Sequence, residues 1–275
     1  MIELKDDGGR DFEEAAGPAV ISVRSSIVVS HTRVFESLWR EAELIARLNE
    51  TERLQREFVD VAAHELKTPV QPILVTAYLL GADEPEGADE EEEIAVKRKY
   101  LTIIFRNAKR LQQLSSNILE VARLGSRSFQ LNRKRINIRD VIQEELRSAR
   151  SKNNTVEWRY EPGDFFVDAD EGRLAEVLAN LLSNAAMFTE KGMISATVGR
   201  QRGEIIVRVA DTGSRIHPEI MPRLFQKFAS KSEANTGTGL GLFISKSIIE
   251  AHWGRMWAEN SRTGGSAFSF SLPAA

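Results

Sequence analysis

The sequence predicts an α+β multidomain protein, in which a hairpin of long helices forms a dimeric four-helix bundle and an α/β sandwich domain follows it. Apolar residues recur with helical spacing over the first half of the chain, whereas strand-like and helix-like segments alternate over the second half. A stretch rich in acids, glycine and proline at residues 81–93 interrupts the helical pattern. A single hairpin buries its apolar seam poorly, so we expect a homodimer.

The composition narrows the class of protein. The chain has 275 residues, 42% of them hydrophobic, which suits about two domains with ordinary cores. The net charge of −3 offers no bulk attraction to nucleic acid, and the absence of cysteine excludes disulfides and thiolate metal sites. The longest nearly uncharged apolar run, Val70 to Leu80, is shorter than the roughly 20 residues of a membrane span. We therefore expect a cytoplasmic protein, or the soluble part of a longer one, with no nucleic-acid partner and no membrane contact within this chain.

The N-terminal part of the chain predicts one long helix after a short leading segment. Residues 1–33 are mixed, and we interpret the β-rich stretch Ala19 to Val29 either as one strand or as a poorly ordered terminus. Residues 34–56 then carry a helical stripe that runs on into the next segment. The stripe comprises Val34, Leu38, Ile45, Leu48, Leu54, Phe58, Ala62, Leu66, Pro69, Ile73, Ala77 and Leu80. The prolines at 69 and 72 each remove a backbone donor, so we expect a kink just after His64.

A second helix is predicted beyond the acidic stretch. Its apolar seam, spaced alternately by three and four residues, comprises Leu101, Ile104, Ala108, Leu111, Ser115, Ile118 and Ala122. The pattern ends near Gly125. The two helices therefore form an αα-hairpin over residues 57–126.

Residues 127–275 predict an α/β layer domain. We expect helices over Asp140–Arg150, Leu174–Phe188 and Leu240–Ala251, and strands over Val156–Tyr160, Phe165–Asp168, Met193–Arg200, Glu204–Ala210, Arg255–Glu259 and Ala267–Leu272. Asp170 is a plausible N-cap of the second helix. A long loop between Asp211 and Gly237 is typical of lids and binding loops.

Two motifs point to chemistry. His64 lies beside Glu65 on a solvated helix face, where a neutral imidazole is available near pH 7 and the carboxylate can orient it and take up its proton. Taken alone, this residue is better explained as an ordinary surface histidine. The second motif, Gly237-Thr238-Gly239-Leu240-Gly241-Leu242, is a glycine-rich loop that leads into a helix, an arrangement that binds phosphate. One chain thus carries a candidate phospho-acceptor and a candidate nucleotide site.

These motifs, in this order, resemble the sensor histidine kinases of two-component systems. The resemblance covers roughly residues 34–275: a signalling linker helix (34–56), a dimerisation and histidine phospho-acceptor domain (57–126), and a catalytic ATP-binding domain of the gyrase/chaperone/kinase superfamily (127–275). For residues 1–33, which precede the matched region, one interpretation is the remnant of a sensor domain and the other is a poorly ordered terminus. The resemblance also implies that His64 attacks the γ-phosphate of ATP, that Glu65 is the general base, and that Thr68 orients water for dephosphorylation of the partner.

The resemblance also assigns the nucleotide site. Asn184 is implied to hold Mg²⁺ and Asn180 to support the phosphate end, since the two lie one turn apart on a helix and neutral amide oxygens suit this ion. Asp211, in Asp211-Thr212-Gly213, is implied to accept a hydrogen bond from the adenine amino group. The remaining cofactor-binding residues implied are Phe188, Gly213, Lys227, Gly237, Thr238, Gly239, Leu240 and Gly241. Taken singly, the asparagines are also explained as solvent-facing or capping residues, and Asp-Thr-Gly as a simple turn.

Three positions depart from the family pattern. Met187 stands where the family commonly has a phosphate-binding lysine, Arg215 replaces the second glycine of the Asp211 motif, and Trp253-Gly254 replaces a Gly-Gly pair. We hypothesise that Arg215 supplies the missing positive charge, because guanidinium binds phosphate well.

The sequence therefore predicts an ATP- and Mg²⁺-dependent protein-histidine kinase that phosphorylates His64 and passes the phosphoryl group to an aspartate of a response regulator receiver domain. Phosphatase action on that regulator is an extension of the same prediction. An alternative, motivated by Met187 and Arg215, is a catalytically weakened scaffold or a phosphatase-biased regulator. A third reading is an ATPase or chaperone that shares only the nucleotide fold.

Overall fold

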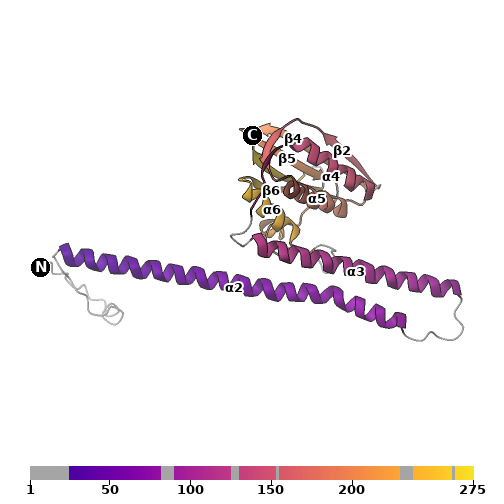
Figure 1. Ribbon diagram of the computed structural model, residues 1–275, viewed down its shortest axis with the longest axis horizontal. Coiled ribbons are helices and arrows are strands. Elements are labelled where there is room, and N and C mark those ends of the chain that lie inside the picture. The colour runs from indigo at the N-terminus through magenta and orange to yellow at the C-terminus, as the bar shows by residue number, and fades with distance from the viewer. Residues whose placement is uncertain (1–24, 82–89, 125–129, 153–154, 230–237, 262–263) are drawn as a thin grey trace. The chain divides into compact units, whose positions relative to one another are not determined.

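The computed structural model describes residues 25–81, 90–124, 130–152, 155–229, 238–261 and 264–275 (Figure 1). The chain divides into two compact units, Met1–Asp60 and Val61–Ala275. Within the described residues, no helix combines the length and the apolar character that crossing a bilayer would require. The strand predicted over Ala19–Val29 is wrong for residues 25–29, which are helical, and its first part lies outside the described residues. Helical continuity with the segment that follows overrides the local β-propensity.

The first unit contains the N-terminal part of α2 (Ser25–Gly81). The predicted apolar stripe is solvent-exposed here, with Val34 at 54% and Leu48 at 67% exposure. Ion pairs one turn apart cover other parts of the surface, such as Arg47–Glu43 at 2.6 Å. Exposed pairs of this kind contribute little to stability. The exposed stripe is therefore the part of this unit that has most to gain from a partner.

The second unit begins with a helical hairpin, made by the rest of α2 and by α3 (Glu90–Leu124). Pro69 and Pro72 lie inside α2, and the helix continues through both of them. On α2 the predicted seam is largely confirmed, since Ala62 and Pro69 are buried. Thr76, rather than the predicted Ala77, is buried in the following turn.

On α3 the predicted seam is half-buried or exposed within the single chain. Leu101, Ala108, Ser115 and Ala122 are exposed, whereas the fully buried positions are Leu114, Glu120 and Val121. The spacing of three and four residues does follow a helical stripe, but α3 carries two adjacent apolar stripes. The spacing alone does not reveal which of them faces α2.

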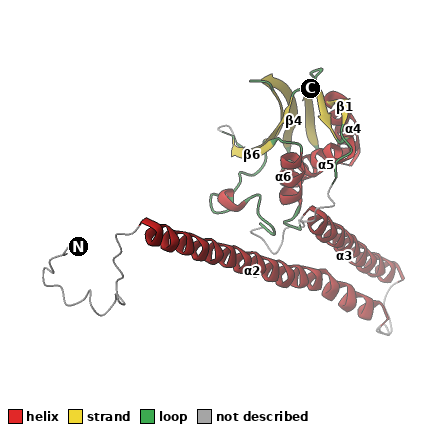
Figure 2. Ribbon diagram, turned by 60° about the vertical axis from the view of Figure 1, so that its left-hand side comes forward, coloured by secondary structure: helices red, strands yellow, loops and turns green. Residues whose placement is uncertain are grey.

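The remainder of the second unit is an α/β domain. Its five-stranded sheet has the order β2 (Val156–Glu161), β4 (Gly192–Gln201), β5 (Glu204–Asp211), β7 (Ser266–Pro273) and β6 (Arg255–Asn260). Only the β2–β4 pair is parallel among these neighbours. Helices α4 (Ile138–Lys152), α5 (Glu171–Phe188) and α6 (Gly241–Ala251) lie together against the sheet (Figure 2).

All predicted helices and strands of this domain are present, with ends that differ by a few residues. Two further elements were not predicted: β1 (Lys134–Asn137), which pairs antiparallel with β3 (Phe166–Ala169), and the short 3₁₀ helix η1 (Met221–Arg223). β1 has only four residues, two of them basic and exposed, so its sequence has no apolar alternation to recognise.

The core lies between the sheet and the helices, and it determines where the functional residues emerge. Along β5, side chains alternate, and Ile205, Val207, Val209 and Asp211 are the buried ones. The first three are apolar, whereas the fourth is a carboxylate at the end of the strand. Its burial follows from the period of two along a strand. The fold therefore directs one acid into the interior at the edge of the core.

Candidate functional site

The phospho-acceptor motif lies on α2, in the second unit. His64 is exposed, and the hydroxyl of Thr68 donates to its backbone carbonyl at 3.1 Å. Glu65 is half-buried and points to α3, where Arg110 lies 3.5 Å from its carboxylate. Consecutive helical residues leave the axis about 100° apart, so the imidazole and the carboxylate diverge. His64 is thus accessible to a reactant, while Glu65 is held by a cation on the neighbouring helix.

Asp211 is a buried acid of the α/β domain whose two carboxylate oxygens both accept hydrogen bonds. It is 4% exposed, and one carboxylate oxygen accepts a hydrogen bond from the backbone N–H of Gly213 at 2.8 Å. The other oxygen accepts from the Ser266 hydroxyl at 2.6 Å. A buried carboxylate requires such donors. Together they fix the orientation of the acid at the end of β5.

Ser266 was not among the residues proposed from the sequence. It begins β7, directly after Gly265, whose φ is +75°. A Cβ at Gly265 would lie 2.0 Å from the carbonyl oxygen of Asp211. The glycine pair before the last strand was the available signal, because glycine marks places where two backbones approach closely.

Phe188 and Gly213 meet at the end of α5. The backbone N–H of Ser214 donates to the carbonyl of Phe188 at 3.1 Å, and a Cβ at Gly213 would lie 2.1 Å from that same oxygen. The Phe188 ring is 41% exposed and Met187 is 40% exposed. The end of α5 that carries the exposed Phe188 is thus held against the backbone of residues 213–214, and Gly213 in turn donates to the buried Asp211 carboxylate.

The glycine-rich loop forms a tight turn at the start of α6. Gly239 has φ +67°, and a Cβ there would lie 2.8 Å from the Cα of Phe228. Leu240 is completely buried and anchors the first turn. No side chain among the described residues caps this helix end, and its N–H groups therefore suit an anion. Gly237, which was also predicted to bind the nucleotide, lies outside the described residues.

Asn180 of α5 reaches this same helix end. Its Nδ2 donates to the hydroxyl of Ser245 at 2.9 Å, and its Oδ1 lies only 2.4 Å from where a Cβ of Gly241 would be. Asn184 is half-buried one turn further along α5. The structure thus brings Asn180 and Gly241 together and places Asn184 on the same side of α5. Two neutral amides beside the N-terminal end of α6 fit a nucleotide phosphate and its metal.

Two predicted cationic residues are engaged elsewhere. The Lys227 ammonium lies 5.3 Å from the centre of the Phe243 ring on the first turn of α6. The Arg215 guanidinium donates to the carbonyl of Ser261 at 3.0 Å, just beyond β6. Trp253 has φ +59° and is 74% exposed, and Arg133 stacks over its ring at 3.6 Å. Lys227 thus lies at the start of α6, beside the glycine turn, whereas Trp253 and Arg133 lie at its end.

Asn117 and Glu120 of α3 both make polar contacts with the α/β domain. Asn117 donates to the hydroxyl of Thr238 at 2.7 Å, and Glu120 forms an ion pair with Arg173 at 2.6 Å. Glu120 has a side chain only 12% exposed, so this pair is shielded from solvent. One of the predicted phosphate-binding residues, Thr238, is therefore already hydrogen-bonded to the hairpin.

Asp170 is the N-cap of α5, as predicted, and accepts from the N–H of Arg173 at 3.2 Å. Burial alone would raise the pKa of its carboxyl, but hydrogen bonds from the backbone of Asn132 and Arg173 outweigh this effect and lower the pKa below its ordinary value. The Asp170 N–H donates to Nε2 of His252 at 3.0 Å. Burial lowers the pKa of His252, against the opposing effect of its hydrogen bond to the Ile248 carbonyl. These groups join the start of α5 to the end of α6.

Comparisons with known proteins give two family matches. Residues 54–127 match the His Kinase A (phospho-acceptor) domain, and residues 169–275 match the family described as histidine kinase-, DNA gyrase B-, and HSP90-like ATPase. His64 and Thr68 lie in the first match. The second match contains the described parts of the glycine turn together with Asn180 and Asp211.

Relatives match almost the whole chain. The sensor histidine kinase WalK of Bacillus subtilis is 27% identical over 99% of this chain and 45% of its own length. The sensor protein FixL of Bradyrhizobium diazoefficiens is 32% identical over 86% of this chain and 47% of its own length. The sensor-like histidine kinase SenX3 of Mycobacterium tuberculosis is 30% identical over 97% of this chain and 67% of its own length. The chain thus spans about half the length of the first two relatives.

Among solved structures, the histidine kinase ThkA in complex with the response regulator protein TrrA matches with a TM-score of 0.63 and 28% identity, over 80% of this chain and 61% of that one. The Acinetobacter baumannii histidine kinase AdeS matches with a TM-score of 0.60 and 20% identity, over 76% of this chain and 97% of that one. The second likeness concerns the fold alone.

Proposed function

Because this chain belongs to the sensor histidine kinases of two-component systems, we propose that it phosphorylates its own His64 with ATP as the phosphoryl donor. The observation that carries the proposal is the exposed imidazole of His64 within the matched phospho-acceptor region, on a chain that also has an ATP-binding domain. We also propose that this reaction takes place in the cytoplasm. We retain the division into linker (34–56), phospho-acceptor (57–126) and catalytic (127–275) domains as part of the proposal.

The reaction forms a bond between an imidazole nitrogen of His64 and the γ-phosphorus of ATP and breaks the bond from that phosphorus to the leaving oxygen of ADP. The proton on the imidazole passes to a base, for which Glu65 is our candidate. Its half-buried carboxylate lies 3.5 Å from the Arg110 guanidinium, which holds the side chain in one orientation. Phosphoryl transfer depends mainly on positioning and charge neutralisation, so the protein needs little covalent chemistry of its own.

We assign the nucleotide contacts by position. Asp211 accepts from the adenine amino group, Phe188 lies along the base, and the N–H groups of Gly239 and Gly241 bind phosphate oxygens. Asn184, with Asn180 beside it, would hold Mg²⁺, which when bound neutralises charge on the phosphate oxygens. This assignment is supported by the fixed orientation of Asp211 and by the close approach of Asn180 to α6.

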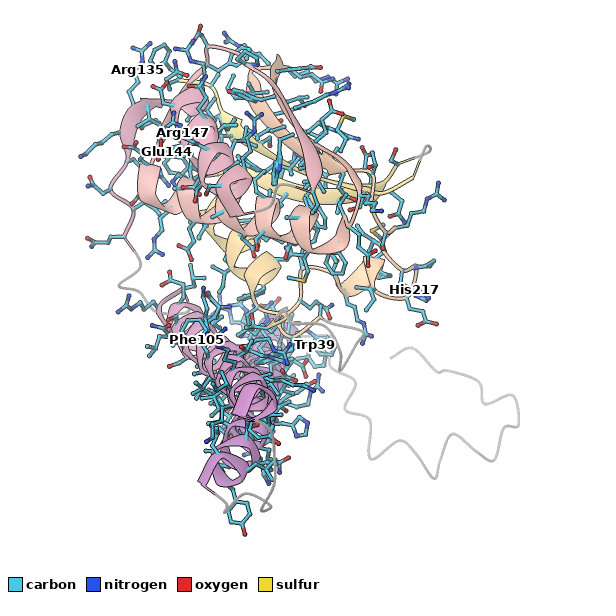
Figure 3. All side chains as sticks on the ribbon, turned by 90° about the vertical axis from the view of Figure 1, so that its right-hand side faces the viewer. Trp39, Phe105, Arg135, Glu144, Arg147 and His217 are labelled. Atoms are coloured by element: carbon cyan, nitrogen blue, oxygen red, sulfur yellow. The ribbon has the colours of Figure 1, made fainter. Side chains whose placement is uncertain are left out.

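We further propose that the phosphoryl group passes from His64 to an aspartate of a response regulator receiver domain, and that Thr68 supports dephosphorylation of that partner. The structural relative ThkA has been solved with a response regulator, which supports this class of partner. We also propose that the chain works as a homodimer. Large apolar side chains exposed on α3, such as Leu101 at 58% and Phe105 at 71% exposure, suit a second copy of the hairpin. Phe105 is labelled in Figure 3.

The second candidate, a weakened scaffold or phosphatase-biased regulator, is favoured by two observations. Met187 offers no charge to a phosphate, and the Arg215 guanidinium is hydrogen-bonded to Ser261. If neither residue binds phosphate, the affinity for ATP falls while the fold is unchanged.

Incubation with γ-labelled ATP and Mg²⁺ separates these candidates. We expect acid-labile, base-stable label on the wild type, none on His64→Ala, and undiminished label on the control His217→Ala. His217 is another exposed histidine, on a loop of the α/β domain (Figure 3). Label that persists in His64→Ala would contradict the assignment of the acceptor. Steady release of phosphate without labelled protein would favour an ATPase. The absence of both labelled protein and released phosphate would favour the scaffold.

A further inference from the structure

We propose that Ser245, on the second turn of α6, is a positioning residue that fixes the side-chain amide of Asn180. In this role it holds the Asn180 oxygen toward the N-terminal end of α6, where the phosphate end of the nucleotide binds. The inference rests on the proposed function, because it concerns the same nucleotide site.

The geometry is that of a slot on one face of α6. Gly241 and Ser245 are four residues apart, so they lie one above the other along the helix. The Asn180 amide enters between them: Nδ2 donates to Ser245 Oγ at 2.9 Å, and Oδ1 approaches Gly241. A Cβ at Gly241 would lie 2.4 Å from Oδ1, so a side chain there would expel the amide. The glycine supplies the room and the serine supplies the orientation.

The burial of Ser245 indicates that its hydroxyl serves this contact. Ser245 is 2% exposed, between the apolar and equally buried Ile244 and Ile248. A buried hydroxyl is unfavourable unless it is hydrogen-bonded, and an alanine or a valine would suit this apolar helix face better. The observed partner of the hydroxyl is the Asn180 amide on the neighbouring helix α5.

The orientation matters because the two ends of an amide are chemically opposite. With Nδ2 engaged by Ser245, the oxygen remains as an acceptor beside Gly241. The terminal torsion of asparagine has a broad, roughly two-fold preference, so without this bond the amide can turn over and present N–H groups instead. An N–H group at this place repels a cation. The pair of amide oxygens that Asn180 and Asn184 would offer to a metal is then lost.

Four proteins test the proposal: wild type, Ser245→Ala, Ser245→Thr and Ser245→Val. Threonine and valine have the same shape and differ only in the hydroxyl, whereas alanine removes an atom and adds no volume. The dissociation constants of Mg²⁺-ATP and of metal-free ADP are measured by calorimetry. We expect Ser245→Ala and Ser245→Val to weaken Mg²⁺-ATP binding by about tenfold and metal-free ADP binding by less than about twofold, with Ser245→Thr like wild type.

A second readout needs no nucleotide. The side-chain amide resonances of Asn180, identified by their loss in Asn180→Ala, are followed by NMR in the full chain with labelled asparagine. They are expected to move in Ser245→Ala and Ser245→Val and to stay in place in Ser245→Thr. Thermal melting of all variants is recorded, and a positioning role leaves it within a few degrees of wild type.

The two failures are distinguishable. If the wild type binds Mg²⁺-ATP and the threonine and valine variants bind it equally, the positioning role is wrong. It is also wrong if metal-free ADP weakens as much as Mg²⁺-ATP, because Ser245 then supports the whole domain. A wild type that binds no ATP contradicts the proposed function itself, and the Asn180 resonances still decide whether Ser245 holds the amide.

Discussion

The hydroxyl of Ser266 donates a 2.6 Å hydrogen bond to the carboxylate of Asp211, and both residues are buried. Asp211 ends β5 and Ser266 begins β7, so the antiparallel register of these neighbouring strands brings the pair together. The carboxylate is therefore oriented before any ligand arrives. Preorganisation of this kind lowers the entropic cost of binding.

Ser266→Ala is expected to weaken ATP binding by about tenfold and to reduce the preference for ATP over GTP, because a mobile Asp211 reads the base less well. Calorimetry with both nucleotides measures this. Ser271→Ala is the matched control, since it removes a buried hydroxyl of the same strand that contacts no hydrogen-bond partner among the described residues. Equal effects of the two substitutions would assign the loss to general destabilisation of β7.

Gly239→Ala is expected to destabilise the start of α6 by about 1–2 kcal/mol, since its left-handed φ of +67° disfavours any Cβ. The approach of Phe228 adds a clash, and ATP affinity should fall with it. Urea unfolding and calorimetry measure the two effects. The control Gly199→Ala has open space around its Cβ, and it should leave both values unchanged. An unaltered ATP affinity in Gly239→Ala would argue against phosphate binding by this turn.

Breaking the Glu120–Arg173 pair is expected to raise the rate of His64 phosphorylation. The catalytic domain has to reach the acceptor, and a shielded contact to α3 opposes any movement away from its present place. Glu120→Gln should therefore increase the initial rate by about fivefold. Glu176→Gln is the control, because Glu176 also pairs with Arg173, at 2.9 Å, but within α5. A slower rate in Glu120→Gln would mean that the contact belongs to the active arrangement.

Stability is expected to fall in mildly acidic solution because of His252. Burial lowers its pKa in the folded protein below the unfolded value of 6.5, so the folded state resists a proton that the unfolded state accepts. The full stability is present above about pH 6.5 and is lost as the pH falls below it. Urea unfolding midpoints, recorded at intervals from about pH 7.5 to about pH 5, measure how steeply the stability falls with pH.

The same series in His252→Gln should show a smaller slope over this range. His217→Ala, which removes an exposed histidine, should keep the slope of the wild type. If the slope is unchanged in His252→Gln, other groups cause it. The lowered pKa of Asp170 acts in a different range: its contribution is present above the unfolded value of 3.8 and is lost as the pH falls through the folded pKa.

Local patterns predicted the elements of the α/β domain well. The helix over Leu174–Phe188 and its Asp170 cap follow from spacing and capping chemistry, and both are confirmed. The seam of α3 was harder, because two apolar stripes lie side by side on one helix, and only the partner helix decides between Leu111 and Leu114.

The residues that hold the candidate nucleotide-binding side chains in place could not be predicted from local patterns. Ser266 reaches Asp211 across 55 residues, and Ser245 reaches Asn180 across 65. Both contacts depend on strand register and helix packing, which no local pattern encodes. A serine in an apolar stretch such as Phe243-Ile244-Ser245 is the one visible trace, since a polar residue on a buried face calls for a partner.

Close backbone approaches hold α6 at both ends. Gly239 lies against Phe228 at the start, and a Cβ at Gly254, just after the helix, would lie 2.0 Å from the carbonyl of Ser271. These contacts fix the length of α6 and oppose any shift of the helix along its axis. Deleting one residue from the middle of α6 would turn one end by about 100° relative to the other. The contact of α6 with Asn180 and the turn at Trp253 and Gly254 could then no longer form together. Apart from positions such as Gly241 and Ser245, α6 should therefore tolerate substitutions more readily than a change in its number of residues.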